Sequence, residues 1–299
     1  MRFPIGIITA LVLILAGIIL APAASGLQPK EGPPPTEARV GLGSSLAGLP
    51  SSPLPRELGD RAQILCWHSF LGQSSIVTDF SLEELAKQLD ALLALGYRFV
   101  SLDDLLAGRI RGSMNLVATL DDGHRTVPAA FAKVFAPRGI VPAIMVYPSI
   151  IGNVPYAMDE AQLRYLRDSG CLVGAHGYHH LFVNEELYRT DRASFDQEVY
   201  RAKARVEDLT KRQIYVYAYP FGAYSEITKR EVARAGYDFG LAVAPGFVYA
   251  DSRLNDRYAL PRIVVRRDGW EELYAFLQRN AALSRGLEAA IKTTPGQGG

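Results

Sequence analysis

Short apolar runs recur along this chain, and each is followed by a polar turn or an amphipathic segment. Runs such as VPAIMVY, at residues 141–147, are apolar at nearly every position rather than at every second one. Continuous apolar runs are typical of strands that are buried on both faces of a parallel sheet. The predicted strands are residues 63–68, 98–100, 115–120, 141–147, 172–176, 214–219, 239–243 and 262–265.

The segments between the strands carry apolar residues at helical spacing. The first is the best marked, because Ser81 and Glu84 have the spacing of a capping box and Gly96 ends the apolar pattern. Further helices are predicted at residues 127–136, 159–168, 195–210, 226–235 and 270–291. Seven or eight successive strand–helix units predict an α/β fold with a parallel sheet. A closed or nearly closed β/α barrel fits the count and the length of about 235 residues better than an open sheet.

The composition narrows the possible partners. The 299 residues are 48% hydrophobic, which is enough for one domain with a substantial core. Lysine plus arginine (32) balances aspartate plus glutamate (31), and the net charge of +1 gives no basic surface for a nucleic acid. Cys66 and Cys171 lie in apolar runs without C-x-x-C spacing, which favours buried free thiols over a disulfide or a cysteine metal site.

The N-terminal part has the composition of an export signal followed by a tether. Residues 1–26 carry no charge after Arg2, which is typical of a secretory signal peptide or a single membrane anchor. An A-P-A sequence favours cleavage and the long apolar run favours a retained anchor, so both alternatives stay open. Either one places the rest of the protein outside the cytoplasm, in the periplasm, at the cell surface or secreted. Residues 27–60 are predicted to be a Pro/Gly/Ser-rich linker, 61–292 the folded domain and 293–299 a flexible tail.

Polar residues follow several predicted strands at the ends that parallel strands share. They are His68 after the first strand, Asp121 and Asp122 after the third, His176 and His180 after the fifth, and a Tyr-Pro-Phe-Gly turn after the sixth. Barrel enzymes carry their sites at the carboxyl ends of the strands. We therefore expect these side chains to converge at one mouth.

The spacing of these residues predicts a metal site with a general base beside it. His176 and His180 are four positions apart, so both can face one cation, although His179 offers a second spacing that stays open. A carboxylate would complete the three protein ligands of catalytic zinc. Neighbouring residues at a strand end point in different directions, so one of Asp121 and Asp122 can bind metal while the other takes a proton from water. Either aspartate could also cap the following helix.

With these residues in place, the chain resembles the polysaccharide deacetylases of carbohydrate esterase family four, which share the NodB-homology domain. TLDDG at 119–123 is similar to that family's T-F-D-D-G, and HGYHH at 176–180 to its H-S/T-x-x-H. The resemblance covers roughly residues 61–270 and implies a distorted (β/α)7–8 barrel. It also implies that Asp122, His176 and His180 hold a divalent metal, usually Zn²⁺, with Asp121 as general base.

The third family motif is matched less closely. YPFG at 219–222 resembles it and implies substrate contacts through Tyr219 and Phe221, with a backbone N–H near Phe221 stabilising the oxyanion. The arginine that usually precedes this motif, and that orients the base in many members, is replaced by Ala218. The residue that orients Asp121 is therefore open, and Arg262 is a candidate.

The general acid also departs from the common pattern. Most members take it from a late Leu-x-His motif, but this chain has no histidine after His180. ILCWHSF at 64–70 resembles instead the M-Y-H segment of the poly-N-acetylglucosamine deacetylase branch, which implies His68 as the acid. Aromatic residues near the expected mouth could stack on sugar rings, although most aromatics in barrels belong to the core. They are Trp67, Tyr147, Tyr178, Tyr219 and Phe221.

The resemblance implies a metal-dependent hydrolase that removes N-acetyl groups from an extracytoplasmic N-acetylglucosamine polymer. His68 favours poly-β-1,6-N-acetylglucosamine as that polymer. Peptidoglycan or chitin-type N-deacetylation and polysaccharide O-acetyl ester hydrolysis are alternatives, because the site chemistry barely separates amide from ester. An alternative of another class is a carbohydrate-binding barrel without turnover. The expected partners are a polysaccharide, Zn²⁺ and, through the N-terminal segment, a membrane.

Overall fold

The computed structural model describes residues 59–293, with side chains described up to residue 286. Its strands are β1 (Arg61–Trp67), β2 (Arg98–Phe99), β3 (Asn115–Leu120), β4 (Ala143–Val146), β5 (Val173–Ala175), β6 (Val216–Ala218), β7 (Phe239–Leu241), β8 (Val248–Tyr249) and β9 (Arg262–Val264). Within these residues they form one sheet in the order β7-β6-β5-β4-β3-β1-β8, with β2 beside β3 and β9 beside β1. Each paired set is parallel except β1 with β8.

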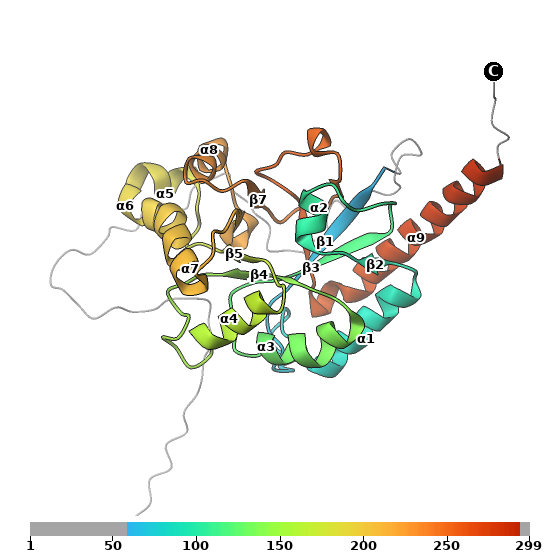
Figure 1. Cartoon of the computed structure of the whole chain (residues 1–299), viewed down its shortest axis with the longest axis horizontal. Helices are drawn as coiled ribbons and strands as arrows, with labels where there is room; N and C mark the ends of the chain where they lie inside the picture. The colour runs from blue at the N-terminus through green and yellow to red at the C-terminus, as the bar shows by residue number, and fades with distance from the viewer. Residues whose placement is uncertain (1–58, 294–299) are drawn as a thin grey trace, which may run out of the picture. The chain divides into compact units, whose positions relative to one another are not determined.

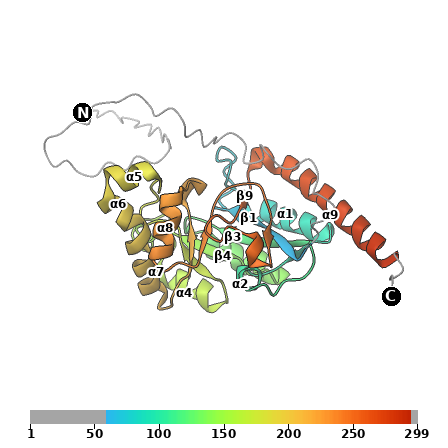
Figure 2. The same cartoon turned by 90° about the horizontal axis from the view of Figure 1, so that it is seen from above.

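The sheet curls until β7 approaches the segment that leads into β9. The Ala242 N–H donates to the Leu260 carbonyl at 2.9 Å, and the Leu260 N–H donates to the Gly240 carbonyl at 2.8 Å. β9 then pairs with β1 in parallel. The expected α/β fold is therefore confirmed as a curled parallel sheet with helices around it, a distorted β/α barrel (Figure 1). Figure 2 gives the view from above.

Alternate residues of each strand face the barrel interior and the surrounding helices. The interior is filled by aliphatic side chains that include Ala62, Ile64, Val117, Met145 and Val216. The other face of β1 carries Leu65 and Trp67, which belong to the larger cluster shared with the helices. Because side chains fill the interior, any functional site has to lie at an end of the barrel.

The helices follow the predicted pattern with local breaks. They are α1 (Leu82–Ala94), α2 (Leu102–Leu106), α3 (Val127–Ala130), α4 (Glu160–Asp168), α5 (Glu185–Thr190), α6 (Arg192–Asp196), α7 (Ala202–Thr210), α8 (Glu226–Arg234) and α9 (Trp270–Thr293). The capping box of α1 is formed as predicted by Ser81 and Glu84. A π-helical turn follows α3 at Phe131–Phe135, and another separates α6 from α7 at Gln197–Arg201. α2 and α5 were not predicted, because helices of five and six residues complete fewer than two turns and give no clear periodicity. The two-residue strand β8 was not predicted either.

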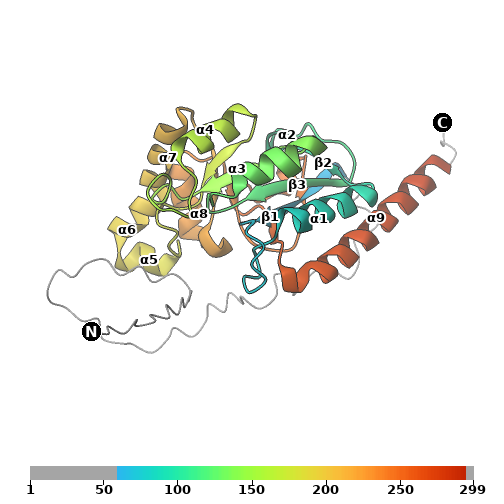
Figure 3. The same cartoon turned by 90° about the horizontal axis from the view of Figure 1, so that it is seen from below.

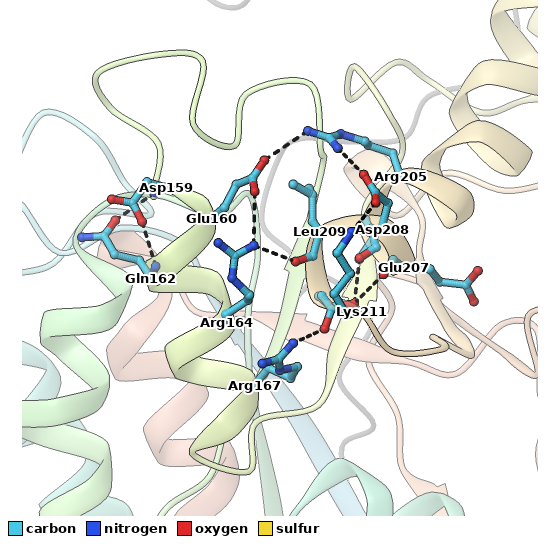
Figure 4. Close-up of polar contacts among 12 residues, drawn as sticks. Asp159, Glu160, Gln162, Arg164, Arg167, Arg205, Glu207, Asp208, Leu209 and Lys211 are labelled. Atoms are coloured by element: carbon cyan, nitrogen blue, oxygen red, sulfur yellow. Dashed lines mark hydrogen bonds and ion pairs between the residues drawn. The ribbon is translucent and has the colours of Figure 1, made fainter.

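Helices α4 and α7 pack against each other on the outside of the sheet (Figure 3). The Arg164 side chain donates to Glu160 at 3.2 Å and to the Leu209 carbonyl at 3.3 Å, and Arg205 reaches Glu160 at 3.3 Å (Figure 4). Partly exposed pairs of this kind contribute roughly 0–1 kcal/mol each. The buried Leu163 and Leu209 therefore do more to hold the two helices together than the charges do.

The expected signal or anchor at 1–26, most of the linker at 27–60 and residues 294–299 of the tail lie outside the described residues. Between residues 59 and 293, no helix is both long enough and apolar enough to span a bilayer. Cys66 and Cys171 are buried and free, as predicted.

Candidate active site

The structure brings the sequence-predicted residues together at the carboxyl ends of the strands. Asp121 and Asp122 follow β3, His176 follows β5 and His68 follows β1. Two adjoining groups of side chains could each hold a metal ion. Within each group, the ligand-type atoms lie within 4.8 Å of one another. The groups are Asp122 with His176 and His180, and Asp121 with His68 and Cys66. The expected convergence is therefore present, while the chemical role of each residue stays a prediction.

The first group has the donor set of a divalent-metal site. The Nε2 atoms of His176 and His180 are 3.2 Å apart, and the Asp122 Oδ1 atom lies 3.7 Å and 3.6 Å from them. Asp122 Oδ1 is buried and has no hydrogen-bond partner within the described part of the chain. A buried carboxylate oxygen without a partner calls for an explanation such as an ion. Two imidazole nitrogens and one carboxylate oxygen suit catalytic zinc, so the residues fit the metal that the resemblance implies.

Both histidines turn their Nε2 atoms toward this position. The His176 Nδ1 atom is 2.9 Å from the Ala218 carbonyl, and because a carbonyl only accepts, Nδ1 carries the proton and Nε2 is free. Burial, and then His176, lowers the pKa of His180 to about 4, so its imidazole is neutral at neutral pH. His179, which spacing alone left open, is exposed and lies 3.0 Å from the Gln197 amide. The geometry thus favours His180 over His179.

The backbone is strained at this end of the barrel. Asp122, His180 and Phe221 have positive φ angles of 74°, 65° and 60°, a conformation that side chains with a Cβ atom disfavour. Such residues cost roughly 1–3 kcal/mol each and persist where the surroundings impose them. Gly222 has a φ of 72°, and a Cβ atom there would lie 2.3 Å from the Val243 Cβ atom. The third motif therefore needs glycine at 222.

Asp121 is held by a buried arginine from β9. The Arg262 Nη1 and Nη2 atoms donate to Asp121 Oδ1 at 2.8 Å and to Oδ2 at 2.9 Å, and the two residues are 1% and 2% exposed. Arg262 also donates to the Thr119 hydroxyl at 3.2 Å. Burial alone would raise the pKa of Asp121, but Arg262 and then His176 outweigh it and hold the pKa well below the usual range. Asp121 is therefore ionised and fixed in orientation.

Arg262 thus occupies the role left open by Ala218. The arginine reaches Asp121 from the last strand of the barrel rather than from β6, and 141 positions separate the two residues. Spacing cannot predict such a pair. The available signal was a single arginine inside the apolar run LPRIVV, because a charge within a buried strand needs a partner.

His68 lies on the Asp121 side of the site, in the group with Asp121 and Cys66. Its side chain is half-buried, and its Nδ1 atom is buried without a hydrogen-bond partner among the described residues. The ring is partly exposed and lies next to the candidate base, so it can meet a polar group of a substrate.

The aromatic residues divide into core and surface. Trp67 and Tyr219 are 0% exposed, and the Tyr219 hydroxyl donates to the Tyr258 carbonyl at 2.9 Å. The expectation that these two rings could meet a sugar is therefore wrong, because Trp67 at the end of β1 and Tyr219 directly after β6 are both buried in the core. Tyr147 and Tyr178 are partly buried.

Of the five aromatic residues predicted to lie near the site, Phe221 is the exposed one. It is 38% exposed, and its ring centroid lies 4.5 Å from that of His180. Phe182, which is 44% exposed, stacks on it with centroids 4.0 Å apart and an angle of 14°. Sequence reasoning missed Phe182, because it lies outside every motif in a segment without periodicity.

Sequence reasoning also missed Glu198. Its carboxylate is fully buried and accepts hydrogen bonds from backbone amides of the segment between His176 and Phe182. The signal was present, since Glu198 lies three positions after Phe195 and directly before Val199, on the apolar face of a predicted helix.

Known proteins were compared with this chain by sequence. A sequence model of the polysaccharide deacetylase family matches residues 111–240. The chain is similar to YxkH of Bacillus subtilis (strain 168), with 25% identity over 150 residues. The match covers 50% of this chain and 51% of YxkH, so the chain spans about half the length of that curated relative.

Solved structures give a likeness over a longer stretch. The fold is similar to that of IcaB from Ammonifex degensii, with 26% identity and a TM-score of 0.63 over 74% of this chain and 98% of IcaB. It is also similar to a de-N-acetylase from Aggregatibacter actinomycetemcomitans, with 15% identity and a TM-score of 0.59 over 73% of this chain and 100% of the other. The second likeness concerns the fold alone.

Proposed function

The chain belongs to the polysaccharide deacetylase family, and from that premise we propose that it is a metal-dependent hydrolase that removes N-acetyl groups from an extracytoplasmic N-acetylglucosamine polymer. Family membership supports the deacetylase activity as such. The observation that carries the finer proposal is the proximity of three kinds of side chain at one end of the barrel. A buried base, a metal-type donor set and a histidine with a free ring nitrogen lie within one small volume.

Asp122, His176 and His180 would hold the divalent ion, and Zn²⁺ suits two imidazoles and one carboxylate. When bound, the ion polarises the acyl oxygen and lowers the pKa of a nearby water. The His176 ring is fixed for this purpose by its bond to the Ala218 carbonyl. Neutral His180 offers its lone pair without first losing a proton.

The remaining steps belong to the chain's own side chains. Water attacks the acetamide carbonyl carbon, and Asp121 accepts the proton that the water gives up. Arg262 keeps Asp121 ionised and aims its oxygens. The C–N bond then breaks, and His68 donates a proton to the departing amine. The products are acetate and a free amino group on the sugar.

The third motif would stabilise the charge that develops on the acyl oxygen. The Phe221 ring lies beside that of His180 in a turn with positive φ, and we expect a backbone N–H of this turn to reach the acyl oxygen. A backbone N–H in that position can donate to the oxyanion without reorganisation. Tyr219 supports this turn from the core rather than by touching substrate, because its ring is buried.

A polymer of amino sugars fits the surface around the site. The stacked rings of Phe182 and Phe221 offer an exposed apolar face next to His180, and sugar rings pack on such faces. Poly-β-1,6-N-acetylglucosamine is the favoured polymer, because His68 on the first strand resembles the arrangement of that branch. Peptidoglycan or chitin-type N-deacetylation and O-acetyl ester hydrolysis are the competing activities of the same site.

The proposal includes the organisation of the chain. We assign residues 61–292 to the catalytic domain and residues 1–26 to a signal peptide or membrane anchor, with 27–60 as the linker and 293–299 as the tail. The absence of charge after Arg2 in the first segment supports this assignment. The catalytic domain would then work in the periplasm, at the cell surface or after secretion.

Acetate release from defined oligosaccharides tests the function. The zinc-loaded protein is expected to release acetate from β-1,6-linked N-acetylglucosamine oligomers faster than from chitin oligomers, peptidoglycan fragments or O-acetylated xylan. A preference for another substrate in this panel would replace the proposed polymer. Binding of glycans without acetate release from any of them would instead make the protein a carbohydrate-binding barrel without turnover.

A further inference from the structure

Glu198 is a buried acid whose carboxylate binds backbone amides of the histidine loop. We use that term for residues 177–181, which connect His176 to the region after His180. The Tyr178 and Leu181 N–H groups donate to Glu198 Oε2 at 3.0 Å and 3.1 Å, and the His179 N–H donates to Oε1 at 2.7 Å. Glu198 itself is 0% exposed and lies in the π-helical turn Gln197–Arg201. Single π-helical turns of this kind occur frequently at functional sites.

The histidine loop has an unusual backbone that these bonds hold in place. Gly177 and His180 both have positive φ angles, of 74° and 65°. The three donated amides lie on both sides of His180, so they fix the chain before and after the imidazole. A carboxylate that accepts two or three backbone N–H bonds forms strong, charge-assisted contacts. Glu198 therefore holds the backbone on both sides of the left-handed residue His180.

Gly177 lies directly against the Glu198 carboxylate. A Cβ atom at 177 would lie 2.4 Å from Glu198 Oε2 and 3.0 Å from Pro220 Cγ. The glycine at this position thus lets the carboxylate approach the loop closely enough to bind its amides. The close approach of Glu198 to the backbone explains why the second residue of HGYHH is glycine.

We propose that Glu198 is a positioning residue for the metal site, and that its carboxylate holds the histidine loop in the conformation that aims His180 at Asp122 and His176. The inference rests on the proposed function in so far as His180 is a metal ligand. Groups that orient metal ligands commonly change metal affinity about 10- to 100-fold when they are removed. A buried acid with a purely structural role would not change that affinity.

The chain offers a matched control in Glu231. This residue is also buried, at 2% exposed, and also makes three contacts, with Arg192, Arg234 and Tyr200 on the side chain. Arg192 lies on α6, Arg234 on α8 and Tyr200 in the π-helical turn Gln197–Arg201, so none of the three is on the histidine loop. Glu231→Gln therefore reports what the loss of a buried carboxylate does to the fold alone.

The test measures Zn²⁺ affinity and loop exposure in the full chain. Zn²⁺ affinity is obtained by competition with a chromophoric chelator, without substrate, for wild type, Glu198→Gln and Glu231→Gln. Glutamine has the same shape but offers one acceptor oxygen in place of two. We expect Glu198→Gln to bind Zn²⁺ about 10- to 100-fold more weakly and to exchange the amide hydrogens of residues 178–181 faster. Glu231→Gln is expected to keep wild-type values for both.

Two results would overturn the inference. One is a folded Glu198→Gln protein with unchanged Zn²⁺ affinity and unchanged exchange in the loop, and the other is an equal loss of affinity in Glu231→Gln. A wild-type protein that binds Zn²⁺ but releases no acetate would refute the proposed activity. The positioning role of Glu198 would then still be decided by the Zn²⁺ affinities. If the wild type binds no Zn²⁺, the metal site fails and the positioning role fails with it.

Three further variants decide the matter if Glu198→Gln does not fold. Glu198→Asp keeps the charge and is expected to retain more Zn²⁺ affinity than Glu198→Ala. Gly177→Ala places a methyl group against the carboxylate and is expected to weaken Zn²⁺ binding in the same way. Equal affinity in wild type, Glu198→Asp and Gly177→Ala would contradict the proposal.

Discussion

Asp121 is bonded through both oxygens to a buried arginine, whereas the neighbouring Asp122 keeps one buried oxygen without a partner in the described chain. Two adjacent carboxylates are thereby given different surroundings. The ion pair to Arg262 leaves Asp121 as a fixed anion next to the site, and the oxygen without a hydrogen-bond partner suits Asp122 to its proposed role as a ligand. Environment rather than residue type divides the two roles.

The first prediction concerns Asp121→Asn. The amide cannot accept the proton from water, so acetate release is expected to fall by about 100- to 10,000-fold. Bound metal is expected to stay near the wild-type level, because Asp122, His176 and His180 are intact. Acetate assays and elemental analysis of the same sample check this. Loss of metal together with activity would identify Asp121 as a ligand and contradict its assignment as base.

The second prediction concerns the stability that Arg262 contributes. Arg262→Met leaves Asp121 as a buried charge without its partner, and breaking such a pair costs about 3–5 kcal/mol. Urea denaturation measures the free energy of unfolding. Arg266→Met is the matched control, because Arg266 pairs with the half-exposed Asp268, and exposed pairs contribute roughly 0–1 kcal/mol. Equal losses in the two variants would mean that the buried pair is not special.

The sequence could predict those parts of the site whose residues lie close together along the chain. The D-D-G and H-x-x-x-H motifs keep their chemistry within a few positions, so their residues were identified before the structure. The Arg262–Asp121 pair joins residues 141 positions apart, and Glu198 binds the backbone of Tyr178, which lies 20 positions earlier. Such contacts depend on which strands become neighbours, and no local spacing encodes them.

At the scale of elements, the N-terminus of α1 is tied to the start of α9. Glu84 accepts from the Ser81 N–H at 2.7 Å in the capping box and pairs with Arg267, in the short turn Arg267–Gly269 that leads into α9. The bonds from Arg267 and then from Ser81 lower the pKa of Glu84 from 4.5 to about 2. One carboxylate thus caps a helix and joins two helices that are distant in sequence.

The third prediction is a pH dependence of that junction. The pKa of Glu84 is lower in the folded chain than in the unfolded chain, so its stabilisation is fully present above about pH 4.5 and is lost as the pH falls toward about 2. Thermal unfolding of wild type and Glu84→Gln is measured between neutral and acidic pH. The difference in midpoint should be largest at neutral pH and shrink toward pH 2. Glu83→Gln, in a fully exposed pair with Lys87, is the control and should change the midpoint less.

Long elements were predicted better than short ones for a physical reason. A strand such as β3 or a helix such as α1 repeats its apolar pattern often enough to be recognised. The two π-helical turns insert an extra residue into predicted helices, and one of them carries Glu198. Periodicity cannot reveal such an insertion, because tertiary contacts rather than local preference stabilise it.

For the described domain as a whole, closure of the curled sheet makes the site possible. β1 and β9 come from opposite ends of the domain, and their pairing brings Arg262 next to Asp121. The sequence predicts a barrel from its strand–helix count, but the antiparallel β8 and the contacts of residues 257–262 with β7 depend on loop conformations that no pattern reports. The site therefore unites residues from 68 to 262 through the topology of the sheet.

The last prediction concerns removal of the metal and tests whether Asp122, His176 and His180 bind it together. A ligand that binds the folded chain alone stabilises it by about 2.7 kcal/mol when its concentration is 100 times the dissociation constant. Excess Zn²⁺ should therefore raise the unfolding midpoint of chelator-treated protein and restore acetate release. His176→Ala removes one ligand and should show neither effect, although its barrel is otherwise complete. An equal rise of the midpoint in wild type and His176→Ala would mean that Zn²⁺ acts elsewhere on the surface, and the assignment of Asp122, His176 and His180 would then be wrong.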